Sequence, residues 1–483
     1  MKTGGHYDAA VIGAGLSGLA AGIRLAHFGK RVCLFERHSA VGGLNSFYSI
    51  AGRRYDVGLH ALTNFARSGG RGTPLTKVLR QLRIDRGELE LFEQRRSRIT
   101  FGARAPAELA FTNDFSVLES EVARAFPGRI DRFRALAERV RATPLSAEPS
   151  PVSARGALRE LLGEPLLEEM LLCPILFYGG AAENDMDFNR FAMLFQAVLL
   201  EGLSRPREGI RAILRLLVDK YRAAGGERRM NCGVTRIRAQ GGRVASLVLD
   251  SGEEVTAVQV LSSAGAVETA ALLEGGSAGG TGPEAPAGRV SFVETISVLD
   301  RQPAELGWGA DTIVFFNDSE KFSYAVPPSL IDTRSGVICI PNNFEFGPAG
   351  GLPEGVVRVT CLASPERWAG LSPEAYREAK QAGYGSVLEC GRRFLPPVAD
   401  AEFSKVTVAT DMFTPLTIER FTGHRNGAIY GSPVKSPRGA TTLQNLHLCG
   451  TDQGLLGIVG SMLSGITMAN QHVLMGPGAP EGR

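Results

Sequence analysis

The sequence lacks paired cysteines, has few aromatic residues and has little net charge. Its seven cysteines, at positions 33, 173, 232, 339, 361, 390 and 449, are scattered singly, with no CxxC pair. This spacing argues against a structural zinc site and indicates a reducing compartment. Aromatic residues make up 7% of the 483 residues, and two of them are tryptophan. The formal net charge of +3 is too small to argue for nucleic-acid binding.

Targeting signals and long apolar runs are also missing. The N-terminal stretch MKTGGHYDAAVIGAG has no charged start followed by an apolar segment, so we expect no signal peptide. Outside the glycine-rich segment near residue 460, no uncharged apolar run reaches the roughly 18 residues of a membrane-spanning helix. We therefore expect a cytoplasmic protein. The mild positive charge is compatible with peripheral contact to an anionic membrane surface.

The first 36 residues predict a dinucleotide-binding site. Ala9–Ile12 has the composition of a short buried strand, and Gly13, Gly15 and Gly18 then form G-x-G-x-x-G at the start of a helical pattern. In this motif the first glycine makes the turn, the second admits a pyrophosphate, and the third lets helix and strand pack closely. The helix N-terminus offers free N–H groups to phosphate. Glu36 ends the next strand, where an acid binds ribose hydroxyls.

The residues after this acid distinguish FAD from NAD. Gly42 and Gly43 follow it in RHSAVGGLNSF. The spacing resembles the acid–x5–Gly-Gly continuation found in FAD-binding proteins of the amine oxidase, phytoene desaturase and GDI superfamily. No second G-x-G-x-x-G with a strand and a helix follows, so we do not expect a separate NAD(P) domain.

The remaining patterns predict helices, then strands, then a mixed region. We expect helices over 74–98 and 115–142, and strongly apolar helices between about 160 and 205. These last helices could be core, line a tunnel for a long apolar substrate, or dip into a bilayer. Low-complexity residues 275–288 predict a flexible surface loop. We expect further strands at 234–237, 244–249, 255–256 and 259–262, an antiparallel sheet over 290–360, and a helix over 373–394.

These expectations define an α/β fold. It would combine a Rossmann-like FAD-binding domain of the two-dinucleotide-binding-domain type with a discontinuous mixed-sheet substrate domain and a helical cap. We assign residues 1–70, 205–275 and 435–483 to the FAD-binding domain. Residues 71–204 form the helical cap, which is also the candidate membrane-facing region, and residues 276–434 form the substrate domain.

The order of motifs resembles one branch of this superfamily. YDVG, GVTRI, TPLTIERFTGHRNGAIYG and GTDQGLLGIVGSMLSG follow the FAD fingerprint. Together they resemble the phytoene desaturase, carotenoid isomerase and retinol saturase family of FAD-dependent oxidoreductases. His60, two residues after Gly58, and the C-terminal segment favour the retinol saturase-like members. The resemblance implies FAD, a long isoprenoid or polyene substrate, and hydride exchange between a C–C unit and flavin N5, in desaturation, saturation or isomerisation.

The same resemblance implies partners and site residues. The redox partner would be a quinone or another electron carrier. His60 is the candidate proton donor at the flavin face, because an unperturbed pKa of about 6.5 suits proton transfer; a purely structural histidine is the alternative. Asp452 would bond the ribityl chain or the pyrophosphate side. Val234 would bring backbone to the adenine. The other implied cofactor contacts are Ser17, Arg37, Leu44, Gly457, Ile458 and Val459.

The glycine-rich segment after Asp452 carries the most specific of these expectations. We expect backbone N–H groups between Gly454 and Ile458, at the start of a helix, to face the flavin's pyrimidine edge, where negative charge gathers on reduction. Gly460 and Gly465 would permit close packing of this helix against a strand. Tyr55, Asp56 and Tyr430 are further candidates in the site, with Asp56 chiefly orienting its loop.

Two other functions remain open at this stage. An amine oxidase-type enzyme would need aromatic residues flanking the flavin, and neither Trp308 nor Trp368 lies in a segment that we can place there. A non-catalytic prenyl-binding module, as in the GDI branch, would have lost the nucleotide site. The intact glycines and Glu36 argue against that second reading.

Overall fold

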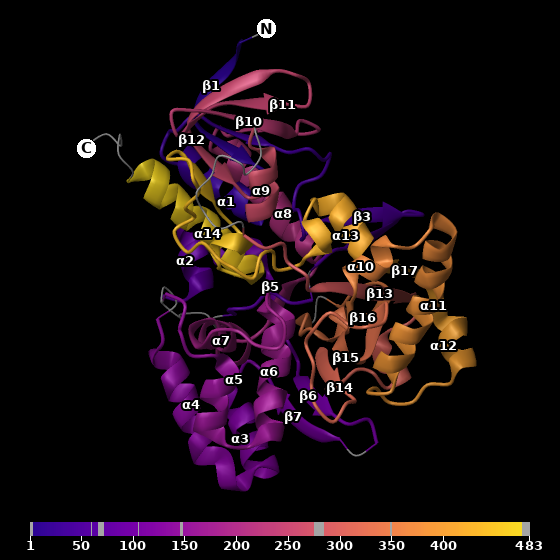
Figure 1. Ribbon diagram of the computed structural model, residues 1–483. Coiled ribbons are helices and arrows are strands. Elements are labelled where there is room, and N and C mark those ends of the chain that lie inside the picture. The colour runs from indigo at the N-terminus through magenta and orange to yellow at the C-terminus, as the bar shows by residue number, and fades with distance from the viewer. Residues whose placement is uncertain are drawn as a thin grey trace.

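Two seven-stranded sheets, with a group of helices beside them, make up most of the part of the chain that the structure describes (Figure 1); two short two-stranded sheets complete it. The computed structural model describes residues 3–58, 60–65, 72–104, 106–144, 148–274, 285–347 and 350–475. The predicted loop over 275–288 falls mainly on residues outside these ranges. The α/β fold class is confirmed, with strands and helices from distant parts of the chain combined in each layer.

The first sheet holds the N-terminal strand at its centre. Its strand order is β10-β11-β12-β1-β2-β9, with β18 paired to β12. β1 runs parallel to both of its neighbours, β12 and β2. The strands predicted at 255–256 and 259–262 form one continuous strand, β12. The bounds are β1 Thr3–Ile12, β2 Val32–Phe35, β9 Glu227–Arg229, β10 Val234–Gln240, β11 Arg243–Leu249, β12 Glu254–Ser262 and β18 Leu446–Leu448.

Two helices from opposite ends of the chain cross closely beside this sheet (Figure 1). They are α1, Leu16–Ala26, and α14, Gly457–Ala469. A Cβ atom on Gly465 would lie 2.0 Å from the Ser17 carbonyl oxygen, so only glycine permits this approach. Further along, Arg24 Nε donates to Asn470 Oδ1 at 2.7 Å. The contacts run in the same order along both helices, so α1 and α14 are parallel. Gly465 therefore serves helix–helix packing, which corrects the predicted helix–strand contact.

The second sheet has the order β17-β13-β16-β15-β14-β6-β7. Its pairs from β17 to β14 are antiparallel, as predicted, and β6 joins β14 in parallel. The helix predicted over 74–98 is wrong beyond its first turns, because α2 ends at Gln81 and Arg83 adopts a φ of +52°. The bounds are β6 Ser97–Phe101, β7 Ala107–Phe111, β13 Ser291–Leu299, β14 Ile313–Asn317, β15 Ile331–Cys339, β16 Gly355–Ala363 and β17 Thr407–Phe413.

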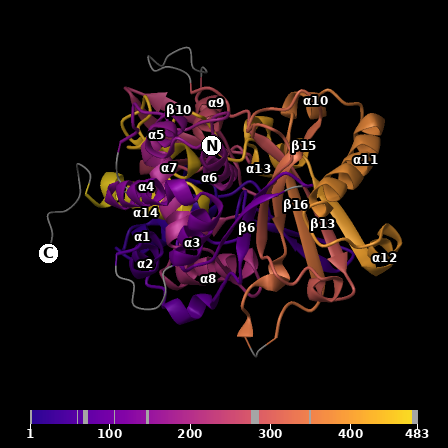
Figure 2. The same ribbon diagram turned by 90° about the horizontal axis from the view of Figure 1, so that it is seen from below.

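Helices cover the two faces of the second sheet (Figure 2). Side chains alternate between these faces, so that Phe315 packs in the cluster shared with the α6 and α7 helices, while Phe316 packs toward α11, Pro373–Arg392. Trp308 and Trp368 both belong to the α11 side. Their indole N–H groups donate to the carbonyls of Pro396 and Leu330, which satisfies both indoles inside the core.

Within the helical cap, the five helices described between residues 115 and 195 pack around an apolar core. The helix predicted over 115–142 is broken at Pro127 into α3 and α4. The apolar side chains of α6 and α7 pack inward, which explains their composition as core. None of the helices in the described ranges combines the length and hydropathy of a membrane crossing. The bounds are α3 Phe115–Ala125, α4 Ile130–Ala142, α5 Ala154–Leu162, α6 Pro165–Gly179 and α7 Phe188–Phe195, the last followed by a π-helical turn, Gln196–Leu200.

Shorter elements connect these layers. The helices α2, Pro74–Gln81, and α8, Ile210–Ala223, join the core around α1 and α14. The other elements are β3 Phe47–Ile50, β4 Arg53–Asp56, β5 Leu91–Glu93, β8 Ser204–Pro206, α9 Ala266–Leu272, α10 Pro365–Ala369, α12 Asp400–Val406 and α13 Pro415–Thr422.

Candidate active site and cofactor cradle

The turn between β1 and α1 has the form of an anion cradle. Gly15 is the N-cap of α1 and offers no side chain to the free N–H groups, and the first turn carries no acid. Gly13 has a φ of +94°, and a Cβ on it would meet Ser263 Oγ at 2.6 Å. A Cβ on Gly18 would meet the Gly13 carbonyl at 2.2 Å. At Gly15 the nearest atom to a Cβ is 4.0 Å away, so the space above the helix start is open.

The predicted acid and the Gly-Gly pair close this cradle on one side. Glu36 is buried and accepts hydrogen bonds from the backbone N–H groups of Ala14 (2.8 Å) and His38 (2.9 Å). Gly42 N donates to the Ala14 carbonyl at 3.0 Å, and the exposed Gly43 lies against Gly15. A carboxylate has about four acceptor positions, so Glu36 retains capacity for hydroxyl donors.

Four further predicted residues lie around the cradle, and they differ in how far their side chains are buried. Val234 begins β10, in a segment whose Cys232 N–H donates to the Glu36 carbonyl at 2.8 Å. The side chain of Arg37 is exposed at the same strand end, and Leu44 is half-buried. Ser17 is buried, with its hydroxyl directed at Cys449 Sγ, 3.5 Å away. Ser17 therefore offers a cofactor its backbone and not its side chain.

The N-terminus of α14 extends the same surface. Gly457 is exposed, with a φ of +71°, and the first turn of α14 has neither a side-chain cap nor an acid. The closest atom to a Cβ on Gly457 is Thr63 Oγ1 at 3.8 Å, so this helix start is open too. Ile458 and Val459 direct their side chains into the core and leave their backbone at the helix start. Because α14 is parallel to α1, both positive helix ends point the same way.

Asp452 lies in a buried junction before α14. Its carboxylate accepts from Ala266 N (2.7 Å), Ser432 N (2.8 Å) and Lys435 Nζ (3.2 Å). Burial lowers the pKa of Lys435 to about 8, against the opposing effect of Asp452. Asp452 thus ties three segments together, and its predicted bond to the ribityl or pyrophosphate groups stays a prediction.

These features fit a dinucleotide flavin. Two parallel helix N-termini without caps or first-turn acids suit an anionic pyrophosphate and an electron-rich ring edge. The distance between them follows from geometry: Gly465 lies level with Ser17, eight residues after Gly457, and at 1.5 Å per residue the two helix starts are offset by roughly 10 Å. A cofactor that reaches both must therefore be extended.

His60 lies on the second sheet rather than in the cradle. Its Nε2 is 2.6 Å from Glu294 Oε2 on β13 and 3.2 Å from Thr360 Oγ1 on β16. Glu294 and Thr360 are paired neighbours in the sheet, and Thr360 Oγ1 donates to Glu294 Oε2 at 2.9 Å. The side chains of His60 and Glu294 are 16% and 10% exposed, so the pair is largely withdrawn from water.

Arginines hold this pair and connect it to β4. Arg358 Nε donates to Glu294 Oε1 at 2.9 Å, and Arg358 Nη2 reaches the Asp56 carbonyl at 3.2 Å. The Asp56 carboxylate accepts from Arg205 and Arg211, each at 3.0 Å. Burial by itself raises the pKa of Glu294, but Arg358 and His60 outweigh it and lower the pKa to about 2. Glu294 is therefore an anion at neutral pH.

An aromatic cluster adjoins His60. Ala61 belongs to the same apolar cluster as Phe177, Phe292 and Phe315. Cys339 belongs to the same cluster, and its Sγ lies 3.7 Å from the His60 carbonyl oxygen. It therefore links the cluster to His60. The Tyr178 hydroxyl is buried in this region, and none of the described residues forms a hydrogen bond with it. Tyr430 donates its hydroxyl to the Phe177 carbonyl. The hydrogen-bonded pair of His60 and Glu294 thus borders a buried apolar, aromatic cluster.

Comparison with known proteins decides the family. Residues 16–388 match the family model described as flavin containing amine oxidoreductase. The chain belongs to this family. Its cofactor is FAD, and it is an FAD-dependent oxidoreductase, so the non-catalytic alternative is set aside.

Relatives of this flavoprotein include polyene enzymes. The chain is 20% identical to "Prolycopene isomerase 2, chloroplastic" of an Oncidium hybrid cultivar, over 96% of this chain and 84% of that protein. It is 23% identical to "All-trans-retinol 13,14-reductase" of Danio rerio, over 95% and 85%. An oxidoreductase structure from Methanosarcina mazei matches with a TM-score of 0.65 at 16% identity, covering 96% of this chain and 100% of the other. At this low identity, the likeness to the Methanosarcina mazei structure supports the fold alone.

Sequence reasoning missed the partners of His60 in this flavoprotein. Glu294, Arg358 and Thr360 lie more than 230 residues from His60 and reach it through sheet pairing. A signal was present, because VSFVETISVLD and VVRVTCLA each carry one charge inside an otherwise uncharged strand core. Burying a charge in a strand is costly unless it is paired.

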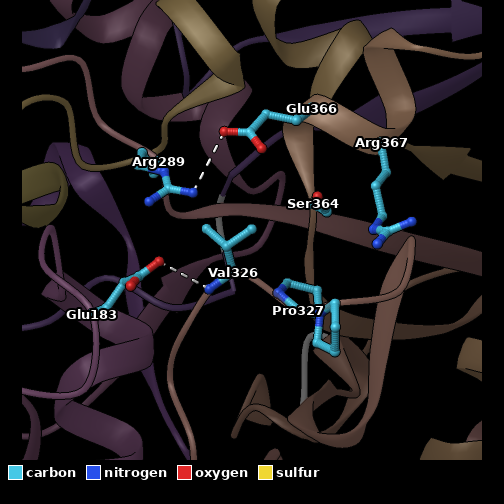
Figure 3. A pocket seen from close by; sticks show the side chains of 8 residues that line it. Glu183, Arg289, Val326, Pro327, Ser364, Glu366 and Arg367 are labelled. Atoms are coloured by element: carbon cyan, nitrogen blue, oxygen red, sulfur yellow. Dashed lines mark hydrogen bonds and ion pairs between the residues drawn. The ribbon is translucent and has the colours of Figure 1, made fainter.

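A separate surface hollow of about 460 Å³ lies away from these residues (Figure 3). Arg289 and Glu366 form an ion pair across it at 3.4 Å, and Glu183 accepts from Val326 N at 3.2 Å. Three of its charged side chains, Arg289, Glu366 and Glu183, thus already pair with one another or with backbone. None of its lining residues belongs to the cradle or to the His60 group.

The charge on Glu294 predicts a component of acid stability. A carboxyl whose pKa is lowered on folding stabilises the folded state above its unfolded pKa and loses this effect as pH falls through the folded value. For Glu294 the window runs from about 4.5 down to about 2. We expect the difference in unfolding free energy between wild type and Glu294→Gln, measured with urea, to shrink across this window. A difference that stays constant with pH would contradict the assignment.

Proposed function

We propose that this flavoprotein acts on a C–C or C=C unit of a long apolar substrate of the polyene or isoprenoid class. Supporting this, its relatives are named as an isomerase of prolycopene and a reductase of retinol. The observation that carries the proposal is the position of His60, which sits in an ionic group at the edge of a buried aromatic cluster. A hydrocarbon needs such apolar surroundings and few polar contacts.

We take saturation as the first candidate reaction, with isomerisation left open, because a titratable side chain lies at the edge of the apolar cluster. Bound FAD supplies hydride exchange at the reacting C–C unit. Saturating a C=C bond also needs a proton, and His60 is the titratable group that we assign to this task. Glu294 orients the ring, and the aromatic cluster excludes water from the reacting carbons. Desaturation of the same class of substrate is the second candidate, because it uses the same groups in reverse.

The test is anaerobic incubation of the FAD-loaded protein with a panel of polyenes. Loss of visible flavin absorbance on mixing with oxidised protein would indicate desaturation. Return of that absorbance on mixing reduced protein with a polyene would indicate saturation, and a changed double-bond geometry without net redox change would indicate isomerisation. An amine oxidase-type enzyme would instead lose absorbance with amines and react with no polyene, which would overturn the proposal.

We predict that His60→Ala lowers turnover by about 100-fold, the scale of a positioned general acid. FAD content should not change, because His60 contacts neither helix start in the cradle. The matched control is His6→Ala, which removes an exposed histidine of β1 bonded to Thr256. Steady-state turnover and the ratio of flavin to protein are the measurements. Turnover within twofold of wild type would remove His60 from the mechanism.

Two partner assignments also remain proposals. A quinone or another electron carrier would complete the redox cycle with this flavin. Peripheral membrane contact would give access to an apolar substrate, and the first turn of α6 presents Leu166, which is 39% exposed, on the cap surface. Most of the other side chains of α6 are buried.

A further inference from the structure

The two ring nitrogens of His60 have different surroundings. Nε2 lies against Glu294 Oε2 at 2.6 Å and Thr360 Oγ1 at 3.2 Å. Among the described residues, Nδ1 has no hydrogen-bond partner. The ring is thus held at one nitrogen and free at the other, with its side chain 16% exposed.

The neighbours of Nε2 decide which nitrogen carries hydrogen. Glu294 is ionised and held by Arg358, so its oxygens only accept. The single proton of the Thr360 hydroxyl is donated to Glu294 Oε2, so Thr360 Oγ1 can meet Nε2 only as an acceptor. Both neighbours therefore require hydrogen on Nε2. In the neutral ring this leaves the lone pair on Nδ1.

The charges around the ring come from several elements. Glu294 stands on β13 and Arg358 on β16, and Cys339 on β15 lies under the His60 backbone. Asp56 on β4 reaches Arg358 through its carbonyl and binds Arg205 through its carboxylate. Every carboxylate named here is committed to an arginine. None competes with Glu294 for His60.

We propose, on the basis of the proposed function, that Nδ1 is the proton-transferring atom of His60 and that Glu294 is the positioning residue that fixes its tautomer. In saturation the C=C unit takes a hydride from the reduced cofactor on one carbon and a proton from Nδ1–H of the imidazolium on the other. The bond order falls by one, and the two electrons come from the cofactor. The ring is left as the Nε2–H tautomer, still bonded to Glu294, and regains its proton from solvent.

The first test needs no substrate. Protein loaded with FAD and labelled with ¹⁵N-histidine is studied by NMR at a pH where the ring is neutral, and the His60 signals are assigned from their absence in His60→Ala. We expect the Nε2–H tautomer in the wild type. We expect a loss of this bias in Glu294→Ala and its retention in Thr360→Val, which keeps the carboxylate. An Nδ1–H tautomer in the wild type would overturn the proposal.

The second test blocks one nitrogen. Replacement of His60 by Nδ1-methylhistidine, through an expanded genetic code, removes transfer through Nδ1, and its protonated ring keeps the Nε2–H donor for Glu294. At a pH where the methylated ring is protonated, we expect flavin content and the melting temperature to be unchanged and turnover of the accepted polyene to fall about 100-fold. Turnover within twofold of wild type would overturn the role of Nδ1.

The third measurement distinguishes a positioning role of Glu294 from a purely structural role. Glu294→Gln should lower kcat by at least tenfold with KM within twofold, while Glu354→Gln, at an exposed glutamate paired with Arg53, should leave both within twofold. Equal losses of kcat and flavin content would overturn a positioning role. If Glu294→Gln does not fold, the tautomer and the methylhistidine results decide. If no polyene reacts at all, the proposed function fails, while the tautomer measurement still confirms or overturns the assignment of the ring.

Discussion

Replacing Gly15 with leucine is expected to give a folded, colourless protein that retains no FAD. At this position a Cβ meets nothing closer than 4.0 Å, so the protein itself accommodates the side chain. The leucine would instead occupy the open space above the N-terminus of α1, where the backbone must approach the pyrophosphate. The fold should persist, because no core contact is displaced.

The control for this variant is a glycine with equal space and no cofactor role. Gly385 on α11 is exposed, and a Cβ there meets nothing within 4 Å. Gly385→Leu should bind FAD like the wild type. Flavin absorbance per protein after purification, and again after incubation with added FAD, is the measurement. A yellow Gly15→Leu variant with full activity would refute the phosphate cradle.

Asp56→Ala is expected to destabilise the protein by about 3–5 kcal/mol, the usual cost of removing one partner from a buried ion pair. Asp56 and Arg205 each have side chains that are 6% exposed, and burial lowers the pKa of Arg205. The site also has no spare room, since a Cβ on Gly209 would lie 1.8 Å from Asp56 Oδ2. Without the carboxylate, the positive charge of Arg205 stays buried beside Arg211.

An exposed ion pair provides the comparison for Asp56. Arg53 and Glu354 pair at 3.0 Å with side chains 36% and 40% exposed. Glu354→Ala should therefore change the unfolding free energy by less than about 1 kcal/mol. Urea unfolding of both variants, followed by far-UV circular dichroism, is the measurement. Similar losses for the two substitutions would show that burial does not set the cost at Asp56.

The backbone turns and helix starts of the candidate cradle were predictable from the sequence, while their contacts with the cofactor stay a prediction. Glycine spacing specifies backbone geometry directly. The turn at Gly13, the close helix–strand approach at Gly18 and the helix start at Gly457 are therefore found at the predicted positions. The strongly apolar α6 was ambiguous, because core, tunnel and membrane surfaces share a composition. Only its neighbours in the fold showed that its side chains pack into the cap.

The group around His60 could not be predicted in the same way. Its assembly depends on sheet register: Glu294 opposes Thr360, and a slip of either strand by one residue would turn that strand's side chain to the other face. Register is set by contacts along whole strands and not by a local motif. The failed helix over 74–98 has a local cause, since Asp85 forms a capping box with Glu88 and redirects the chain toward β5.

The parallel crossing of α1 and α14 has a consequence for biosynthesis. The glycine contact between them joins residue 17 to residue 465, so the two helix starts that form the cradle come from opposite ends of the chain. A ribosome must synthesise and release the segment around residue 465 before both are present. FAD is therefore expected to bind the growing chain only after this segment has emerged, long after the α1 half of the cradle has been made.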